Sequence, residues 1–201
     1  LNGENNEKNI EIINEISPLL LSYLKKLNEF SYKNITLLHK YLPDIVNSMK
    51  NAPLQKLTLC KCFKAKEDIS IFNSYFTGSN ELTEVDLSNH NFSFVSLLSN
   101  SLLNYSNNKK IISLNFNSCC LNDDDIKAIT TYIIDDISLK ECFINNNNLS
   151  QKSCFQIGYA IEKTVSLEKI EMNNCDINGE TIMPIFNGTG SQSLKYIDLS
   201  N

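Results

Sequence analysis

One apolar pattern recurs along this sequence of 201 residues. Each copy has an apolar residue first, an apolar residue or Cys fourth, an apolar residue sixth, and Cys, His or Asn ninth. Six copies begin at Leu54, Leu82, Ile111, Leu139, Leu167 and Leu194, so the steps are 28, 29, 28, 28 and 27 residues. A weaker copy begins at Leu27, and the last copy is truncated. Such a regular period predicts a repeat architecture with one structural unit per copy.

Each unit combines a strand with a helix. The fourth and sixth positions alternate with polar residues, which is typical of a half-buried strand. Apolar residues then follow at spacings of three and four, which indicates a helix. Three sets show this spacing: Val95, Leu98 and Leu102; Ile126, Ile129 and Ile133; Cys154, Ile157 and Ile161. We expect the helices to be capped by Ser93, by Asn122 or Asp123, and by Ser150.

A single strand and helix cannot bury their apolar faces alone, but stacked neighbours can. Strands in a sheet lie about 4.8 Å apart, whereas helices are about 10 Å wide. The helical layer must therefore lie on the outside of a curve. The predicted fold class is α/β, a right-handed horseshoe solenoid with a parallel sheet on its concave face and helices on its convex face.

The pattern L-x-x-L-x-L-x-x-[N/C]-x-L resembles the leucine-rich-repeat family, in particular its long ribonuclease-inhibitor-like subclass. The resemblance covers residues 27–201. Lys64 replaces the last apolar residue of one copy, and His90 and Ile35 stand where the pattern has Asn or Cys. The resemblance implies protein binding, because members of the family act as inhibitors, cytoskeletal regulators and innate immune sensors.

Residues 1–26 are predicted to form a helical cap or the helix of an earlier repeat, with a break at Ser17-Pro18. Its shared apolar face would be Ile10, Ile13, Ile16, Leu20 and Leu24. At the other end, the strand from residue 194 has no helix after it. Since the sequence also begins with Leu rather than Met, we expect a fragment of a protein that continues past residue 201.

Composition argues against several classes of protein. The net charge is −5, which does not suit a nucleic-acid partner. No apolar run reaches the roughly 18 residues of a membrane helix, and no signal peptide is visible. The seven Cys lack the spacing of a disulfide framework, which favours reduced thiols and a cytoplasmic location.

No motif predicts a metal, a cofactor or catalysis. The pairs Cys60/Cys62 and Cys119/Cys120 have no second pair at zinc spacing, and the sequence has only two His. The run 122–125 lacks the Gly and the distant Glu of a calcium loop, so we interpret its carboxylates as helix caps. His90 occupies the ninth repeat position and is interpreted as a structural substitute for Asn.

The concave face is the predicted binding site. Its strand side chains come from the third, fifth and seventh positions of the repeats. The candidate contact residues are Lys56, Thr58, Glu84, Asp86, Asn115, Asn117, Glu141, Phe143, Asn145, Lys169, Glu171, Asn173, Tyr196 and Asp198. Carboxylates outnumber Lys here, so the expected partner is a protein with a basic surface. Phe143 and Tyr196 would be its aromatic anchors.

We therefore predict a non-catalytic scaffold within a larger intracellular regulatory protein, with actin-cytoskeletal regulation as the preferred role. One alternative is a GTPase-activating protein of the Ran type, for which no catalytic residue can be matched and no Arg is present. Another is an extracellular recognition protein. The sequence leaves the oligomeric state open.

Overall fold

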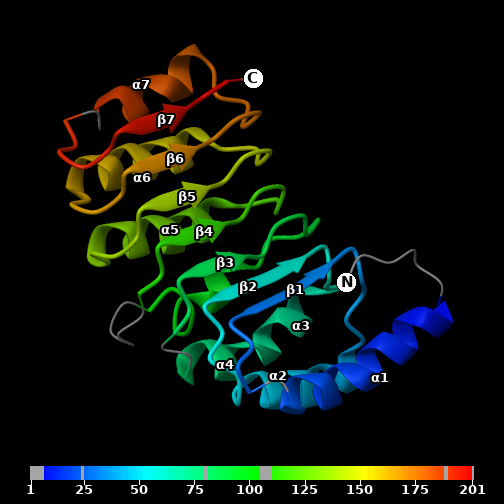
Figure 1. Ribbon diagram of the computed structural model, residues 1–201. Coiled ribbons are helices and arrows are strands. Elements are labelled where there is room, and N and C mark those ends of the chain that lie inside the picture. The colour runs from blue at the N-terminus through cyan, green and yellow to red at the C-terminus, as the bar shows by residue number, and fades with distance from the viewer. Residues whose placement is uncertain (1–6, 24, 79–80, 105–109, 188–189, 201) are drawn as a thin grey trace.

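The described residues of the computed structural model, 7–23, 25–78, 81–104, 110–187 and 190–200, form one seven-stranded parallel sheet. Its strands follow one another in chain order (Figure 1). They are β1 (Glu29–Lys33), β2 (Lys56–Cys60), β3 (Glu84–Asp86), β4 (Ser113–Asn115), β5 (Glu141–Phe143), β6 (Lys169–Glu171) and β7 (Tyr196–Asp198). The predicted α/β class and parallel sheet are therefore confirmed.

The strands pair in the register of the sequence repeat. Leu57 lies opposite Val85, and Val85 lies opposite Leu114. Phe30 of the weak first copy pairs with Leu57, so the copy beginning at Leu27 belongs to the same series. A slip of one residue would turn every apolar side chain to the wrong face, which explains why the period fixes the register.

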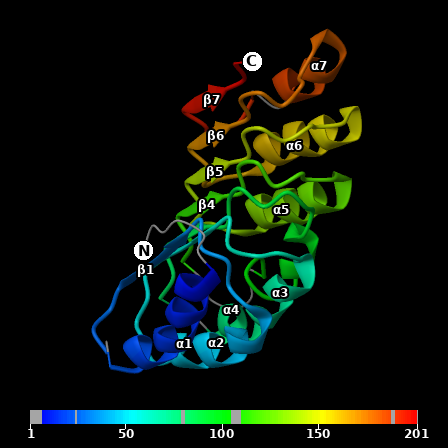
Figure 2. The same ribbon diagram turned by 90° about the vertical axis from the view of Figure 1, so that its right-hand side faces the viewer.

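The helices and 3-10 helices lie between and before the strands. They are α1 (Glu7–Tyr23), η1 (His39–Tyr41), α2 (Leu42–Met49), α3 (Lys66–Ile71), α4 (Asn73–Gly78), η2 (Val95–Leu98), α5 (Asp123–Asp135), α6 (Gln151–Lys163) and α7 (Gly179–Asn187). Figure 2 shows α5, α6 and α7 stacked in a column along one face of strands β4 to β7. Consecutive strand–helix units therefore stand side by side, as the pattern predicts.

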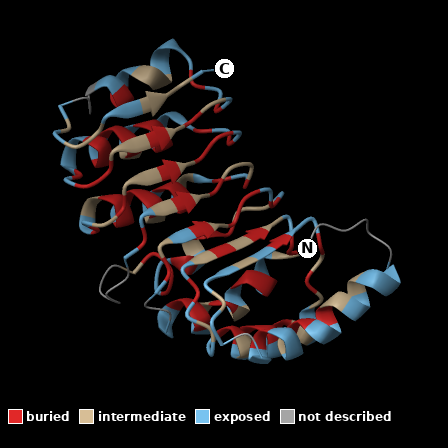
Figure 3. Cartoon of the chain, viewed as in Figure 1, coloured by how far each residue is buried: buried red, intermediate tan, exposed pale blue. Residues whose placement is uncertain are grey.

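The core lies between the sheet and the helices (Figure 3). The fourth and sixth repeat positions of β2 to β6 are all buried, as predicted. Ile197 and Leu199 of the last copy are only half-buried. Ile197 lies in β7 and Leu199 just after it, at the edge of the described sheet, where a neighbouring repeat covers the apolar residues on one side alone.

The ninth repeat position is buried in the bend after each strand. Cys62, Cys119 and Cys175 each donate their S–H to a carbonyl of the preceding repeat, at 3.1 to 3.2 Å. Asn147 donates in the same way to the Phe116 carbonyl at 3.1 Å. Asn147 Oδ1 also accepts the N–H groups of Cys119 and Leu121 (3.0 and 3.1 Å), which a thiol does poorly.

His90, like Asn147, accepts a backbone N–H group of the repeat before it. Its Nε2 accepts the Cys62 N–H at 3.2 Å, and its Nδ1 lies 2.9 Å from the Leu87 carbonyl. The Nδ1 atom must therefore carry the ring proton, because Nε2 acts as an acceptor. Ninth residues that accept, His90 and Asn147, thus alternate with Cys along the chain. The interpretation of His90 as a structural substitute for Asn agrees with these contacts.

The eighth repeat position has a left-handed backbone. Positive φ angles occur at Asn34 (58°), Lys61 (53°), Asn89 (63°), Ser118 (55°), Asn146 (56°) and Asn174 (51°). Asn tolerates this conformation better than most residues, which gives its recurrence at this position a local reason. Because the chain leaves the extended conformation at Lys61, Cys60 and Cys62 do not continue one strand.

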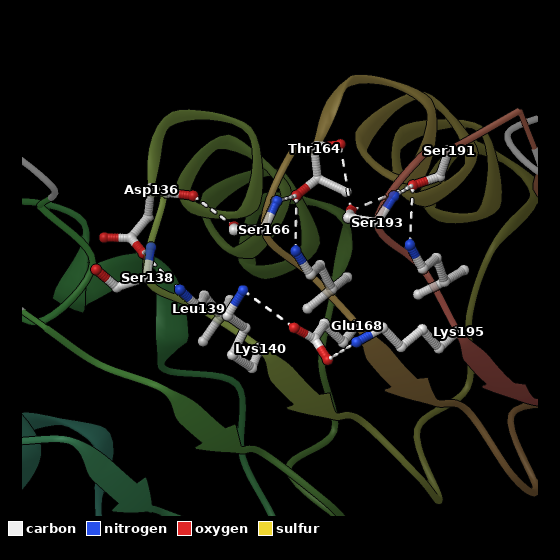
Figure 4. Close-up of polar contacts among 12 residues, drawn as sticks. Asp136, Ser138, Leu139, Lys140, Thr164, Ser166, Glu168, Ser191, Ser193 and Lys195 are labelled. Carbon is white, nitrogen blue, oxygen red and sulfur yellow. Dashed lines mark hydrogen bonds and ion pairs between the residues drawn. The ribbon is translucent and has the colours of Figure 1, made fainter.

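Short polar loops lead into the last strands (Figure 4). A side-chain oxygen three residues before each repeat accepts the N–H of its first residue: Asp136 for Leu139 (2.7 Å), Thr164 for Leu167 (3.2 Å) and Ser191 for Leu194 (3.3 Å). Ser166 Oγ also donates to the Asp136 carbonyl at 2.8 Å, which ties adjacent repeats together. Outside these loops, Glu168 pairs with Lys140 (3.1 Å) and Lys195 (2.6 Å).

The structure corrects the prediction for the N-terminal helix. No break occurs at Ser17-Pro18; α1 continues through Pro18. The buried residues are Asn14, Ser17 and Leu21, whereas Ile16 and Leu20, predicted to lie on the shared face, are exposed. Ser17 compensates locally, since its hydroxyl contacts the Ile13 carbonyl and the Tyr32 hydroxyl. Leu24 lies outside the described residues.

The predicted caps hold for two helices and fail for a third. Asn122 forms a capping box with Asp125, and Ser150 accepts the Ser153 N–H at 3.1 Å. Ser93 caps no helix; instead its hydroxyl donates to Asp125 at 2.5 Å. The expected helix through Leu102 is reduced to η2, although Val95, Leu98 and Leu102 are all buried as predicted. In this segment the spacing of the apolar residues predicted their burial correctly, but it did not predict the length of the helix.

Candidate functional site

The sheet face away from the helices carries the third- and fifth-position side chains. We call it the open sheet face. It consists of Glu29, Ser31, Lys56, Thr58, Glu84, Asp86, Ser113, Asn115, Glu141, Phe143, Lys169, Glu171, Tyr196 and Asp198. Most of these side chains are half-buried or exposed, because the strand alternation turns their neighbours into the core.

The first half of this face is built around one lysine. The Lys56 ammonium lies 3.0 Å from the Glu84 carboxylate and 3.7 Å from that of Glu29. The hydrogen bond to Glu84 is the main reason that the pKa of Lys56 is raised. Asp86 lies on β3 with Glu84. Its carboxylate accepts the Ser88 N–H at 3.0 Å, and this hydrogen bond fixes the orientation of the carboxylate.

A shallow hollow of about 240 Å³ opens beside these residues. Its walls include Thr58, Asp86, Ser113, Asn115 and Phe143. The hollow therefore combines a carboxylate, small hydroxyl and amide groups and one aromatic side chain. Such a mixture suits a side chain with an apolar stem and a cationic end.

The second half of the face is built around another lysine. Lys169 forms an ion pair with Glu171 at 2.8 Å. Its ammonium also lies 5.0 Å from the centre of the Phe143 ring and 5.2 Å from that of Tyr196. The Tyr196 hydroxyl donates to Asp198 at 3.2 Å. Hydrogen bonds, first that from the Ser200 N–H, hold the pKa of Asp198 below its usual range.

The charge on the open sheet face is unbalanced. Its six carboxylates, at Glu29, Glu84, Asp86, Glu141, Glu171 and Asp198, face two ammonium groups, at Lys56 and Lys169. The difference is four negative charges. Among the described residues, Asp86, Glu141 and Asp198 take part in no ion pair within 4.0 Å. The face therefore keeps acidic groups that its own lysines do not neutralise.

The seventh-position residues Asn117 and Asn145 bond to the backbone of the next repeat. Asn117 Oδ1 accepts the Asn145 N–H, and Asn145 Oδ1 accepts the Asn173 N–H, both at 2.7 Å. Asn145 is buried and also donates to Glu171 at 3.1 Å. These three predicted contact residues thus join neighbouring repeats, and Asn145 has little surface to offer a partner. The recurrence of Asn every 28 residues in the sequence could have predicted these hydrogen bonds between repeats.

Three residues of the face are not among the candidate contact residues: Glu29, Ser31 and Ser113, although Ser113 occupies a third repeat position. Glu29 and Ser31 of β1 line the same hollow as Thr58 and Asp86. The candidate list began at the second copy because the first is degenerate. The repeat period between the copies that begin at Leu27 and Leu54 predicts the register in which Ser31 pairs with Thr58.

Five of the seven thiols and the His90 ring are buried. Burial raises the pKa of the Cys62, Cys119 and Cys142 thiols to about 12 and that of Cys175 to about 11. Burial also lowers the pKa of His90. Within the described ranges, no three His, Cys, Asp or Glu side chains are grouped so as to hold a metal ion.

The fold and the face define a class: an α/β repeat protein whose parallel sheet leaves one acidic, partly aromatic surface open. The sequence matches no protein-family model, and no curated protein matches it. In the part of the chain that the structure describes, no helix has the length and apolar character needed to cross a membrane.

Several solved structures are similar to this chain. The C-terminal domain of tropomodulin from Caenorhabditis elegans aligns over 87% of this chain and 90% of that chain, at 12% identity and a TM-score of 0.48. Actin-binding site 2 of leiomodin-1 aligns over 94% and 91%, at 12% identity and a TM-score of 0.45. Both scores lie below 0.5, so the fold described above rests on the strand order and register of this chain itself.

Proposed function

We propose that this chain is a non-enzymatic scaffold that binds a protein partner through the open sheet face. The proposal takes this face as the concave side of a leucine-rich-repeat solenoid of the ribonuclease-inhibitor-like type. The observation that carries it is the excess of six carboxylates over two lysines on one broad surface, beside a hollow with an aromatic wall.

The chemistry of the face selects the partner. A basic segment would be attracted by the net negative charge, which speeds association and disfavours acidic competitors. A Lys or Arg side chain of the partner fits the hollow, with its charged end toward Asp86 and its stem along Phe143. The aromatic side chains would supply most of the affinity, since aromatic anchors dominate binding energy at interfaces.

The test reverses charge on the face and compares it with an equal reversal elsewhere. Asp86→Lys combined with Glu141→Lys removes two of the acidic groups that form no ion pair. The control, Asp135→Lys combined with Glu162→Lys, changes the net charge equally at exposed positions on α5 and α6. Proteins captured by the wild type and quantified by mass spectrometry should be retained by the control and lost by the face variant, while circular dichroism shows that both variants are folded.

Equal capture by both variants would reject the open sheet face as the binding site. Actin is the first single candidate, because the repeat pattern resembles that of cytoskeletal regulators. Co-sedimentation of the wild type and both variants with actin filaments tests it directly. The proposal that the chain does not act as a GTPase-activating protein is tested by adding it to a Ran-type GTPase. The rate of GTP hydrolysis should stay unchanged.

A further inference from the structure

The N-terminal helix α1 carries a second apolar face that points away from the rest of the chain. Five large apolar side chains are exposed along it: Ile12 (53%), Ile16 (41%), Leu19 (57%), Leu20 (51%) and Tyr23 (82%). Figure 3 shows α1 at the end of the molecule next to β1, with exposed residues along its outer side. We call these five residues the outer stripe.

The outer stripe is not part of the core. Asn14, Ser17 and Leu21 are the buried residues of α1, and at 100° per residue they lie opposite the stripe. Asn14 fixes this orientation, because its amide donates to the Thr36 carbonyl and accepts the Leu38 N–H, each at 2.9 Å. The helix therefore cannot roll the stripe inward without breaking buried hydrogen bonds.

The size of the stripe exceeds what single exposed apolar residues would give. Five such side chains present roughly 500 Å² of apolar surface, near the upper limit of the largest patch on a typical monomer. It is also a narrow ridge along a helix of 17 residues, about 26 Å long. A ridge of this shape fits another helix along its length.

Charge around the stripe identifies the occupant. The first half of α1 carries Glu7, Glu11 and Glu15 with Lys8, whereas Lys25 and Lys26 follow its end. Antiparallel pairing with a second copy brings the acidic half of each helix to the basic end of the other. Parallel pairing would set like charges together, and the acidic half also disfavours an anionic membrane surface.

We propose that the outer stripe is a self-association site, at which α1 pairs with α1 of a second copy about a twofold axis. With the axis between Ile16 and Leu19, Ile16 packs on Leu19 of the second copy and Ile12 packs on Tyr23. Such an interface is isologous and closes after two copies. Because the stripe offers less than the roughly 800 Å² per partner of a stable complex, the dimer should dissociate in the micromolar range.

Sedimentation equilibrium on the whole chain, across the micromolar range, tests this proposal. The wild type should shift from monomer to dimer, and Leu19→Asp should remain monomeric at every concentration. Phe155→Asp is the matched control, since Phe155 lies on helix α6 and is also 57% exposed; it should dimerise like the wild type. Circular dichroism checks that each variant is folded.

A second variant tests the direction of pairing. Lys25→Glu combined with Lys26→Glu should weaken the dimer at least tenfold, because in this register it places acidic groups near Glu7 and Glu11 of the second copy. A wild type that is monomeric throughout, a Leu19→Asp variant that dimerises normally, or a tighter dimer from the double variant would each overturn the proposal. The outcome is independent of the open sheet face, whose variants lie on β3 and β5.

Discussion

Replacing Asn147 by alanine should be among the most damaging changes of a polar residue in this chain. The side chain is 1% exposed and makes five hydrogen bonds. Its Oδ1 accepts two backbone N–H groups of the preceding repeat, and its amide donates to the carbonyls of Phe116, Ile144 and Asn145. Alanine leaves all five backbone groups without these partners, inside a bend.

The magnitude follows from the two N–H groups that lose their only described acceptor. A buried donor without a partner costs about 1–3 kcal/mol, and the three carbonyls add a smaller amount because they share one amide. We expect Asn147→Ala to lower the free energy of unfolding by about 3–5 kcal/mol, which lies at the high end for single substitutions. Asn147→Cys should cost about 1 kcal/mol less than Asn147→Ala, because a thiol can still donate to the Phe116 carbonyl but leaves the two N–H groups without an acceptor.

Urea denaturation followed by far-ultraviolet circular dichroism measures these differences, since the chain has no Trp for fluorescence. Asn148→Ala, at the exposed neighbouring position, is the control and should change stability by less than about 0.5 kcal/mol. A loss below about 1 kcal/mol for Asn147→Ala, or equal losses for Ala and Cys, would refute the reasoning.

Three further outcomes are expected. Because burial lowers the pKa of His90, the unfolded chain binds more protons below pH ~6.5, so stability should fall as the pH decreases from there; His90→Asn should remove this part of the acid sensitivity of the melting temperature. Gly158→Ala should destabilise by about 2 kcal/mol, since its Cβ would lie 2.0 Å from the Pro184 carbonyl oxygen. Two thiols, Cys60 and Cys120, should react quickly with Ellman's reagent in the native protein.

Each of these outcomes has its own check. Gly179→Ala is the partner control for the glycine, because nothing lies within 4 Å of its added Cβ; similar losses at both sites would contradict the close-contact argument. A melting temperature equally sensitive to acid in His90→Asn would remove the histidine as the cause. Urea should release all seven thiols, and rapid native reaction of more than two would show that the ninth-position cysteines are accessible.

The repeat could be predicted from the sequence because its signal is periodic. Spacing alone gave the strand register, the buried fourth and sixth positions and the polar bend at Asn147. It also placed Asp86 and Phe143 on one face, since strand alternation leaves no other choice. These features depend on local geometry that repeats every 28 residues or so.

Features that depend on a neighbour's shape could not be predicted in this way. The N-terminal helix has apolar residues on both sides, so periodicity did not decide which side packs, and Asn14 rather than Ile16 became buried. Ser93 looks like a cap in isolation, but the Asp125 carboxylate from the following repeat accepts its hydroxyl instead. Only the stacked arrangement brings those two residues together.

The alternation at the ninth position has a consequence for rearranging the chain. Cys62 and Cys119 are each followed, one repeat later, by a residue that accepts their N–H, namely His90 and Asn147. Excising the repeat that carries His90 or Asn147 would set two thiol-bearing repeats next to each other and leave the N–H of the first Cys without its acceptor. Excising two preserves the order of donors and acceptors, so the natural module for shortening or lengthening this protein is a pair of repeats.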